Sequence, residues 1–138
     1  METGYFTVNH ITIDMIGDAH NTSMNYRTVV PEFDKTNLEE EYKDGFNIPF
    51  VKKSPVQLYC KFVNEYTIKE NKTIHIIASI EHIFFDKDLE HKDGWIQLDK
   101  GNVVTLNGVD GYFLPKLIDR IQPAHQNIPS RSNRKEEV

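Results

Sequence analysis

Two long stretches of alternating residues, 56–66 and 73–85, constrain the fold of this chain more than any other feature. In the first, Val56, Leu58, Cys60 and Phe62 occupy every second position, the period of a half-buried strand. In the second, apolar residues fall on both faces, which is typical of a barrel strand or of a strand with a partner on its outer side. The turn-prone residues 70–72 lie between the two stretches, so we expect an antiparallel pair.

Shorter elements are expected on either side of this pair. Residues 5–11 are rich in aromatic and β-branched side chains and predict a strand. A weak helix is expected from residue 14 to about residue 26, followed by a turn at 31–36 with Phe33 pointing inward. The sequence therefore predicts a mainly β fold with short helices.

Composition restricts the class of protein. The chain has 138 residues, enough for one domain, and its 38% hydrophobic and 27% charged residues are typical of a globular protein. The net charge of −5 and the lack of a basic stripe argue against nucleic-acid or anionic-membrane binding. No apolar run approaches the roughly 20 residues of a membrane span. With no signal-like start and Cys60 as the one cysteine, we expect a cytoplasmic protein.

Motifs for metal or nucleophilic chemistry are missing from the sequence. The six histidines do not form HExxH, HxH or a Cys/His knuckle, so we expect no metal site. No G-x-S-x-G elbow exists, and the glycines of 108–111 do not follow the dinucleotide-binding pattern. No residue is identified as catalytic.

Polar side chains after the first strand form the remaining candidate site. Asn9 lies near the end of that strand, and Thr22 and Ser23 lie at the end of the predicted helix. Their amide and hydroxyl groups are suited to hydrogen-bond the edge of a heterocycle or a phosphate. The alternative is that Thr22 and Ser23 only cap the helix and turn the chain.

Several segments carry a family resemblance through their order and spacing. They resemble the flavin reductase-like family, whose domain is an FMN-binding split β-barrel related to flavoredoxin. The matching segments are residues 2–10, 19–23, 31–34, 48–55, the strand pair with 80–83, 93–96 and 108–112. The resemblance covers residues 1–126, which we expect to form one flavin reductase-like domain, and residues 127–138 are expected to be a flexible polar tail.

The resemblance implies a function and a site. It implies a homodimeric flavoprotein that holds FMN non-covalently, receives electrons from NADH or NADPH and passes them on as an oxidoreductase. It places Asn9, Thr22 and Ser23 beside the cofactor and Tyr112 toward the same site. For Tyr112 the alternative is a packed aromatic ring with a satisfied hydroxyl.

One departure from the family pattern keeps other functions open. Several family strands precede the segment that resembles residues 2–11, and we find no counterpart to them in this sequence. We therefore expect a truncated, partial split barrel with either a dimer contact or an exposed apolar face where those strands would pack. Two alternatives remain, a non-catalytic remnant that dimerises but binds flavin weakly or not at all, and a small β-barrel module for another ligand.

Overall fold

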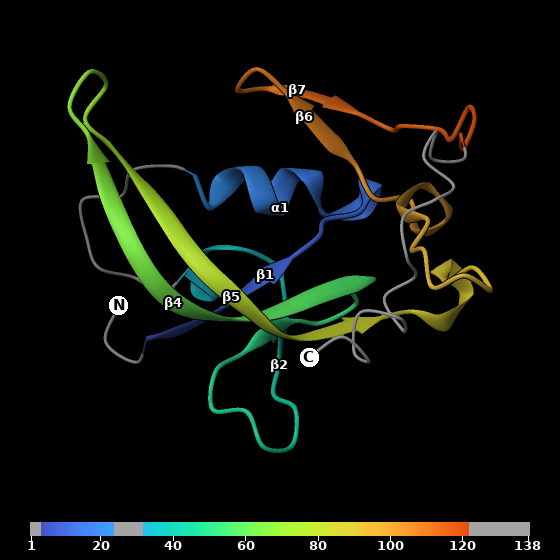
Figure 1. Ribbon diagram of the computed structural model, residues 1–138, viewed down its shortest axis with the longest axis horizontal. Helices are drawn as coiled ribbons and strands as arrows, with labels where there is room; N and C mark the ends of the chain where they lie inside the picture. Colours follow the sequence, from blue (N-terminus) through green and yellow to red (C-terminus); the bar gives the residue numbers. More distant parts are fainter. Residues whose placement is uncertain (1–3, 24–31, 122–138) are drawn as a thin grey trace, which may run out of the picture.

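The computed structural model describes residues 4–23 and 32–121, and the fold of these residues is mainly β (Figure 1). Short 3-10 turns accompany the strands at Ile13–Met15, Glu32–Lys35, Lys87–Leu89 and Leu98–Gly101. The named elements are β1 (Tyr5–Asn9), α1 (Ile16–Asn21), β2 (Glu40–Glu41), β3 (Phe50–Val51), β4 (Val56–Ile68), β5 (Thr73–Phe85), β6 (Thr105–Asn107) and β7 (Gly111–Phe113).

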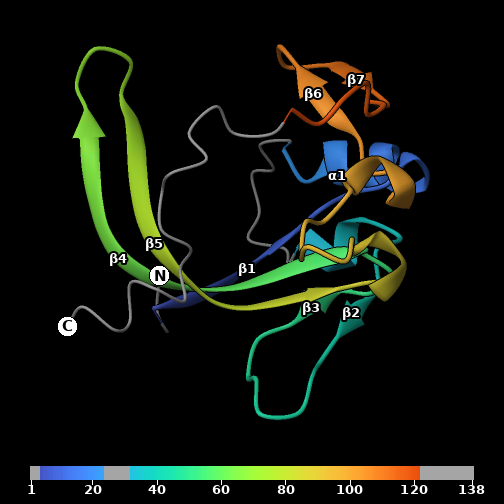
Figure 2. The same ribbon diagram turned by 45° about the vertical axis from the view of Figure 1, so that its right-hand side comes forward.

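The predicted strand pair is confirmed as the centre of the molecule. β4 and β5 pair antiparallel from Val56↔Phe85 to Ile68↔Thr73, and β1 pairs antiparallel with the other edge of β4. The register of β4 and β5 shifts between Tyr59 and Cys60 and again between Phe62 and Asn64. Such irregularities bend and twist a strand pair, and the two strands curve strongly along their length (Figure 2).

The smaller elements cover different sides of this open three-stranded sheet. The β2–β3 pair lies on one side, and α1 and the β6–β7 hairpin lie on the other (Figures 1 and 2). Phe50 of β3 is fully buried, and Phe46 packs edge-on against Tyr59 and Phe84 with ring centroids 4.6 and 5.5 Å apart. This aromatic packing holds the β2–β3 pair against the sheet.

The core contains the one cysteine of the chain. Cys60 is buried with Met15, Phe50, Val56, Leu89 and Val103. Burial raises the pKa of the Cys60 thiol because the apolar surroundings disfavour the thiolate. The thiol therefore serves packing rather than chemistry.

The chain after β7 is held against the loop that follows β5. The Arg120 guanidinium lies 4.1 Å from the Trp95 ring and forms a 2.8 Å ion pair with Asp93. The backbone N–H of Leu117 donates to Asp99 Oδ2 at 2.7 Å. These contacts bring the last described residues back over the loop between β5 and β6.

The predicted exposed apolar surface is present on the long hairpin. Ile76 and Ile80, which share one face of β5, keep 49% and 55% of their surface accessible, and Ile74, Ile83, Val63 and Tyr66 are exposed as well. Exposed apolar side chains gathered on a hairpin in this way are typical of a surface that binds another molecule.

The helix is shorter than the sequence predicts. A 3-10 turn occupies its predicted start, and α1 ends at Asn21 rather than near residue 26. The hydroxyls of the next two residues bond to carbonyls of the last helical turn. Residues 24–26 and the predicted tail at 127–138 lie outside the described residues. No helix within the described ranges is long and apolar enough to cross a membrane.

Candidate functional site

The end of α1 carries two of the predicted site residues. Thr22 Oγ1 donates to the carbonyl of Ala19 at 2.7 Å, and Ser23 Oγ donates to the carbonyl of His20 at 2.7 Å. The same two carbonyls also accept the backbone N–H groups of Thr22 and Ser23, at 3.2 and 3.0 Å, so both residues close the last turn of the helix. The capping role considered as the alternative is therefore present. Each hydroxyl still has lone pairs that accept a hydrogen bond from a ligand N–H.

Asn9 joins two strands with its side-chain amide. Its Nδ2 donates to Thr7 Oγ1 at 3.1 Å, and its Oδ1 accepts from the backbone N–H of Val51 at 3.0 Å. Thr7 in turn donates to the carbonyl of Pro49 at 2.9 Å. Asn9 and Thr22 line a cavity of about 180 Å³ together with Thr7, Phe33, Thr36, Leu38 and Val51.

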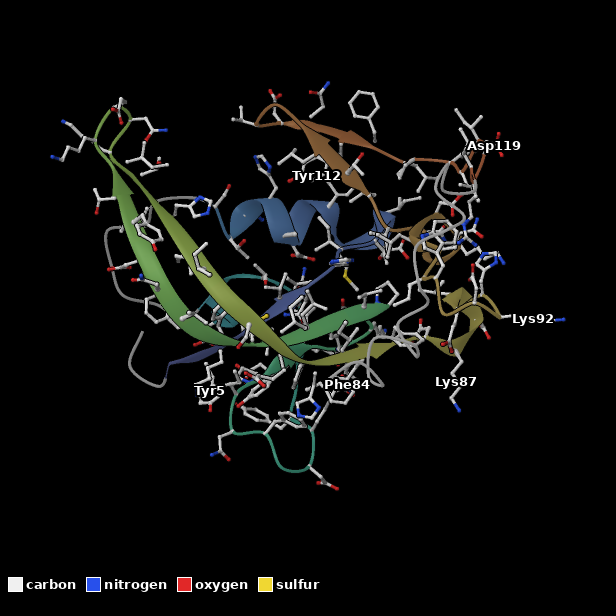
Figure 3. The ribbon with its side chains drawn as sticks, in the orientation of Figure 1. Tyr5, Phe84, Lys87, Lys92, Tyr112 and Asp119 are labelled. Carbon is white, nitrogen blue, oxygen red and sulfur yellow. The ribbon has the colours of Figure 1, made fainter. Side chains whose placement is uncertain are left out.

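Tyr112 lies on the other side of the helix end. Its side chain points from the β6–β7 hairpin toward α1 (Figure 3). Its hydroxyl shares a 3.0 Å hydrogen bond with Nδ1 of His20, and the two rings meet edge to face with centroids 5.9 Å apart. The pair lines a cavity of about 310 Å³ with Ser23, Thr105 and the aliphatic Ile11, Ala19, Val104, Leu106 and Val109.

The four predicted residues thus form two pairs on either side of one helix end. Asn9 and Thr22 line the smaller cavity, and Ser23 and Tyr112 line the larger one. Ligand sites are typically about 300–1,000 Å³ and mostly apolar, with a few polar groups. The larger cavity reaches this range, whereas the smaller cavity alone falls below it.

The fit to FMN is good for the ring system and incomplete for the phosphate. Aliphatic walls with a hydroxyl and an imidazole at one edge suit a planar heterocycle. Among the described residues, no lysine or arginine lines either cavity, and the Thr22 and Ser23 protons are already donated to carbonyls. The described residues would therefore suit a flavin ring but offer no charge-assisted contact to its phosphate.

His20 is the residue that sequence reasoning missed. It entered the sequence analysis as one of six histidines tested against metal motifs and as part of the matching segment 19–23, with no role of its own. Its partner Tyr112 is 92 positions away, so no local pattern reports the contact. The available signal was that His20 lies three residues before Ser23 near a helix end, a spacing that places two side chains close together.

Two other features near β1 belong to neither cavity. His10 follows Asn9, and its Nδ1 is buried with no hydrogen-bond partner among the described residues. Burial lowers the pKa of His10 because the charged imidazolium loses hydration. A cavity of about 450 Å³ lies nearby with acids and lysines mixed in its walls, including the exposed 2.8 Å pair Lys52–Glu39, but no predicted site residue lines it.

Clusters suited to a metal ion are missing from the described residues, where no three His, Cys, Asp or Glu side chains gather in that way. The polar groups at the end of α1 are amide, hydroxyl, imidazole and phenol. This set suits hydrogen bonding to an organic ligand.

Solved structures identify the class of protein to which this fold corresponds. A split-barrel protein of Shewanella frigidimarina NCIMB 400, assigned as a flavin reductase, is 32% identical to this chain with a TM-score of 0.83. The match covers 88% of this chain and 62% of that one. No protein-family model matches the sequence, and no curated protein matches it significantly.

More distant structures share the fold. Flavoredoxin of Desulfovibrio vulgaris (Miyazaki F) has 17% identity and a TM-score of 0.70 over 91% of this chain and 66% of its own. Nitrilotriacetate monooxygenase component B of Bacillus cereus has 17% identity and a TM-score of 0.68 over 88% of this chain and 61% of its own.

The fold is therefore that of the split-barrel flavin reductase-like proteins, and the resemblance drawn from the sequence is confirmed. The chain spans 61–66% of the length of these three structures. Activity, substrates and partners of the whole protein are taken up below as proposals.

Proposed function

We propose that this chain binds FMN non-covalently at the end of α1 and acts as a flavin reductase-like oxidoreductase that takes electrons from NADH or NADPH. One observation carries the proposal: the residues predicted from the resemblance line two cavities on either side of that helix end. The 32% identity to a protein assigned as a flavin reductase supports the same ligand class.

The residues of this chain would bind and orient the flavin. Ile11, Val104 and Leu106 would cover the ring system and exclude water, and the Tyr112 hydroxyl would bond a polar ring edge. Asn9 and Thr22 would contact the ligand from the smaller cavity. Bound flavin supplies the hydride chemistry, whereas the protein supplies position and electrostatics.

A second copy of the chain is the proposed partner. The exposed apolar face of β4–β5 includes Ile76 and Ile80, and β5 lies at the edge of its sheet. An exposed edge strand with apolar side chains is a template for pairing with another chain. A homodimer that covers this face would bury the exposed isoleucines and also protect the unpaired edge of β5.

The test is FMN binding by the purified chain, followed through quenching of flavin fluorescence. The double variant Thr22→Ala/Ser23→Ala should weaken binding by at least about fivefold, because each of the two lost hydrogen bonds is worth about 0.5–1.5 kcal/mol. The matched control Thr67→Ala/Thr73→Ala, at the exposed tip of the β4–β5 hairpin, should bind as the wild type does.

Reduction is tested next, by bleaching of the bound flavin with NADH or NADPH under anaerobic conditions. A wild type that does not quench FMN contradicts the proposal and favours a non-catalytic dimerisation or binding module. Equal loss in the double variant and its control would show that Thr22 and Ser23 are not part of the flavin site.

A further inference from the structure

The cavity between α1 and the β6–β7 hairpin has its polar edge built from two side chains that bond to each other. Tyr112 contributes the hydroxyl, and His20 Nδ1 lies 3.0 Å from it. Both residues are half-buried, and the walls around them are mainly aliphatic. In such surroundings a hydroxyl that bonds one fixed partner has a defined direction for its remaining hydrogen bond.

The imidazole controls what that hydroxyl presents to a ligand. When Nδ1 accepts the phenol proton, the Tyr112 oxygen has only lone pairs left for the ligand. When Nδ1 carries a proton and donates it to the phenol oxygen, the O–H of Tyr112 is free to donate to a ligand carbonyl or ring nitrogen. The tautomer of His20 therefore decides whether Tyr112 is a donor or an acceptor.

The two side chains also join parts of the fold that have few other contacts. His20 lies on the last turn of α1, and Tyr112 lies in the three-residue strand β7, which pairs only with β6 among the described strands. The rings meet edge to face at 73°. This contact holds the hairpin over the helix, so the width of the cavity depends on it as well.

We infer that His20 is a positioning residue for the ligand of this cavity, and that it acts through Tyr112. The inference rests on the proposed flavin function for the identity of the ligand, a planar heterocycle with hydrogen-bonding edges. In this role His20 fixes the direction and the donor or acceptor state of the Tyr112 hydroxyl before the ligand arrives. Such preorganisation lowers the cost of binding.

Two conservative variants separate this role from a structural one. Asparagine places an amide oxygen or nitrogen the same number of bonds from the backbone as Nδ1 and can either donate or accept, so His20→Asn should keep the bond to Tyr112. Glutamine carries its amide one bond further out, so His20→Gln should lose the bond. His75→Gln, on the exposed part of β5, is the control.

The first measurement needs no flavin. In protein labelled with 13C at tyrosine Cζ, the Tyr112 resonance is identified by its loss in Tyr112→Phe, and its chemical shift reports the hydrogen bond of the hydroxyl. We expect the wild type, His20→Asn and His75→Gln to share one shift and His20→Gln to differ. An unchanged resonance in His20→Gln would overturn the inference whatever the flavin result.

The second measurement is FMN fluorescence quenching. His20→Gln and Tyr112→Phe should each weaken binding about fivefold, the value of one neutral hydrogen bond, while His20→Asn stays within about twofold of the wild type. The double variant His20→Gln/Tyr112→Phe should bind no more weakly than Tyr112→Phe alone, because both changes remove one interaction.

Other outcomes count against the role. Equal losses in His20→Asn and His20→Gln, or a double variant that multiplies the single losses, would show that His20 does not act through Tyr112. A wild type that fails to quench FMN would refute the proposed function and with it the role of His20 toward flavin. The tyrosine resonance would then still decide whether His20 holds the hydroxyl.

Discussion

At the scale of single residues, most polar side chains around β1 form hydrogen bonds within the protein. Asn9 bonds both Thr7 and the backbone of Val51, so it joins β1 to β3 whether or not it contacts a ligand. The single hydroxyl proton of Ser54, which is buried, is shared between the carbonyls of His10 and Val56, at 2.7 and 2.9 Å. The exception is the buried Nδ1 of His10, which has no partner among the described residues.

This exception predicts a pH-dependent stability. Because burial lowers the pKa of His10 in the folded protein, the unfolded chain binds a proton at this site more readily than the folded one. The contribution of neutral His10 is complete above the unfolded pKa of about 6.5 and is lost as pH falls through the lowered folded pKa. Urea unfolding of the wild type and His10→Gln between pH 8 and pH 5 measures this contribution to the free energy of unfolding.

The expected result is that the wild type loses more stability than His10→Gln as the solution is acidified. His75→Gln, a change of an exposed histidine, should follow the wild type. Parallel curves for the wild type and His10→Gln would contradict the assignment.

At the scale of elements, turns between strands carry much of the backbone strain of this fold. Lys53 joins β3 to β4 with a φ of 68°, and Lys72 turns between β4 and β5 with a φ of 57°. Such left-handed conformations are unfavourable for residues with a side chain. Both turns are short, and the register of the flanking strands depends on them.

Replacing Lys53 by glycine should therefore stabilise the protein by up to about 1 kcal/mol, since relief of the strained φ outweighs the added freedom of the unfolded chain. Lys52→Gly is the control, because Lys52 has a negative φ and its exposed ion pair with Glu39 contributes little. Lys52→Gly should be neutral or destabilising in urea unfolding. Stabilisation by both variants, or by neither, would show that the positive φ of Lys53 does not lower the stability of the folded protein.

At the scale of the whole molecule, the sheet β1–β4–β5 is open, and its longest strand pair is largely uncovered. The secondary elements cluster around the end of the pair near Val56 and Phe85, whereas the tip near Ile68 and Thr73 extends away from them (Figure 2). Exposed isoleucines on an arm of this shape are typical of a surface that a partner covers.

We expect multi-angle light scattering to give a mass of twice 16.1 kDa for the purified chain. Ile76→Lys/Ile80→Lys should convert it to a monomer, because two buried charges at an interface without partners are strongly unfavourable. Asp44→Asn/Asp110→Asn, at two exposed positions outside β4 and β5, makes the same change of about +2 in net charge and controls for it. A wild type that is monomeric at all concentrations would refute the dimer proposal.

Local pattern in the sequence determined the secondary structure. The alternation over 56–66 and 73–85 predicts both long strands because side chains of a strand point to opposite faces in turn. The prediction also placed Thr22 and Ser23 at a helix end, because short hydroxyl side chains compete for helix carbonyls, but it extended the helix to about residue 26, beyond its observed end at Asn21. The family resemblance added residues that no periodicity marks as functional.

Only the tertiary structure decided how those residues are grouped. It separates Asn9 and Thr22 from Ser23 and Tyr112 into two cavities, and it brings His20 to Tyr112. These arrangements depend on how α1 and β6–β7 pack on one side of the sheet. Such packing is the sum of many weak contacts between residues that lie far apart in the chain. The periods of two and 3.6 residues that identify strands and helices report only local structure, so they do not predict these contacts.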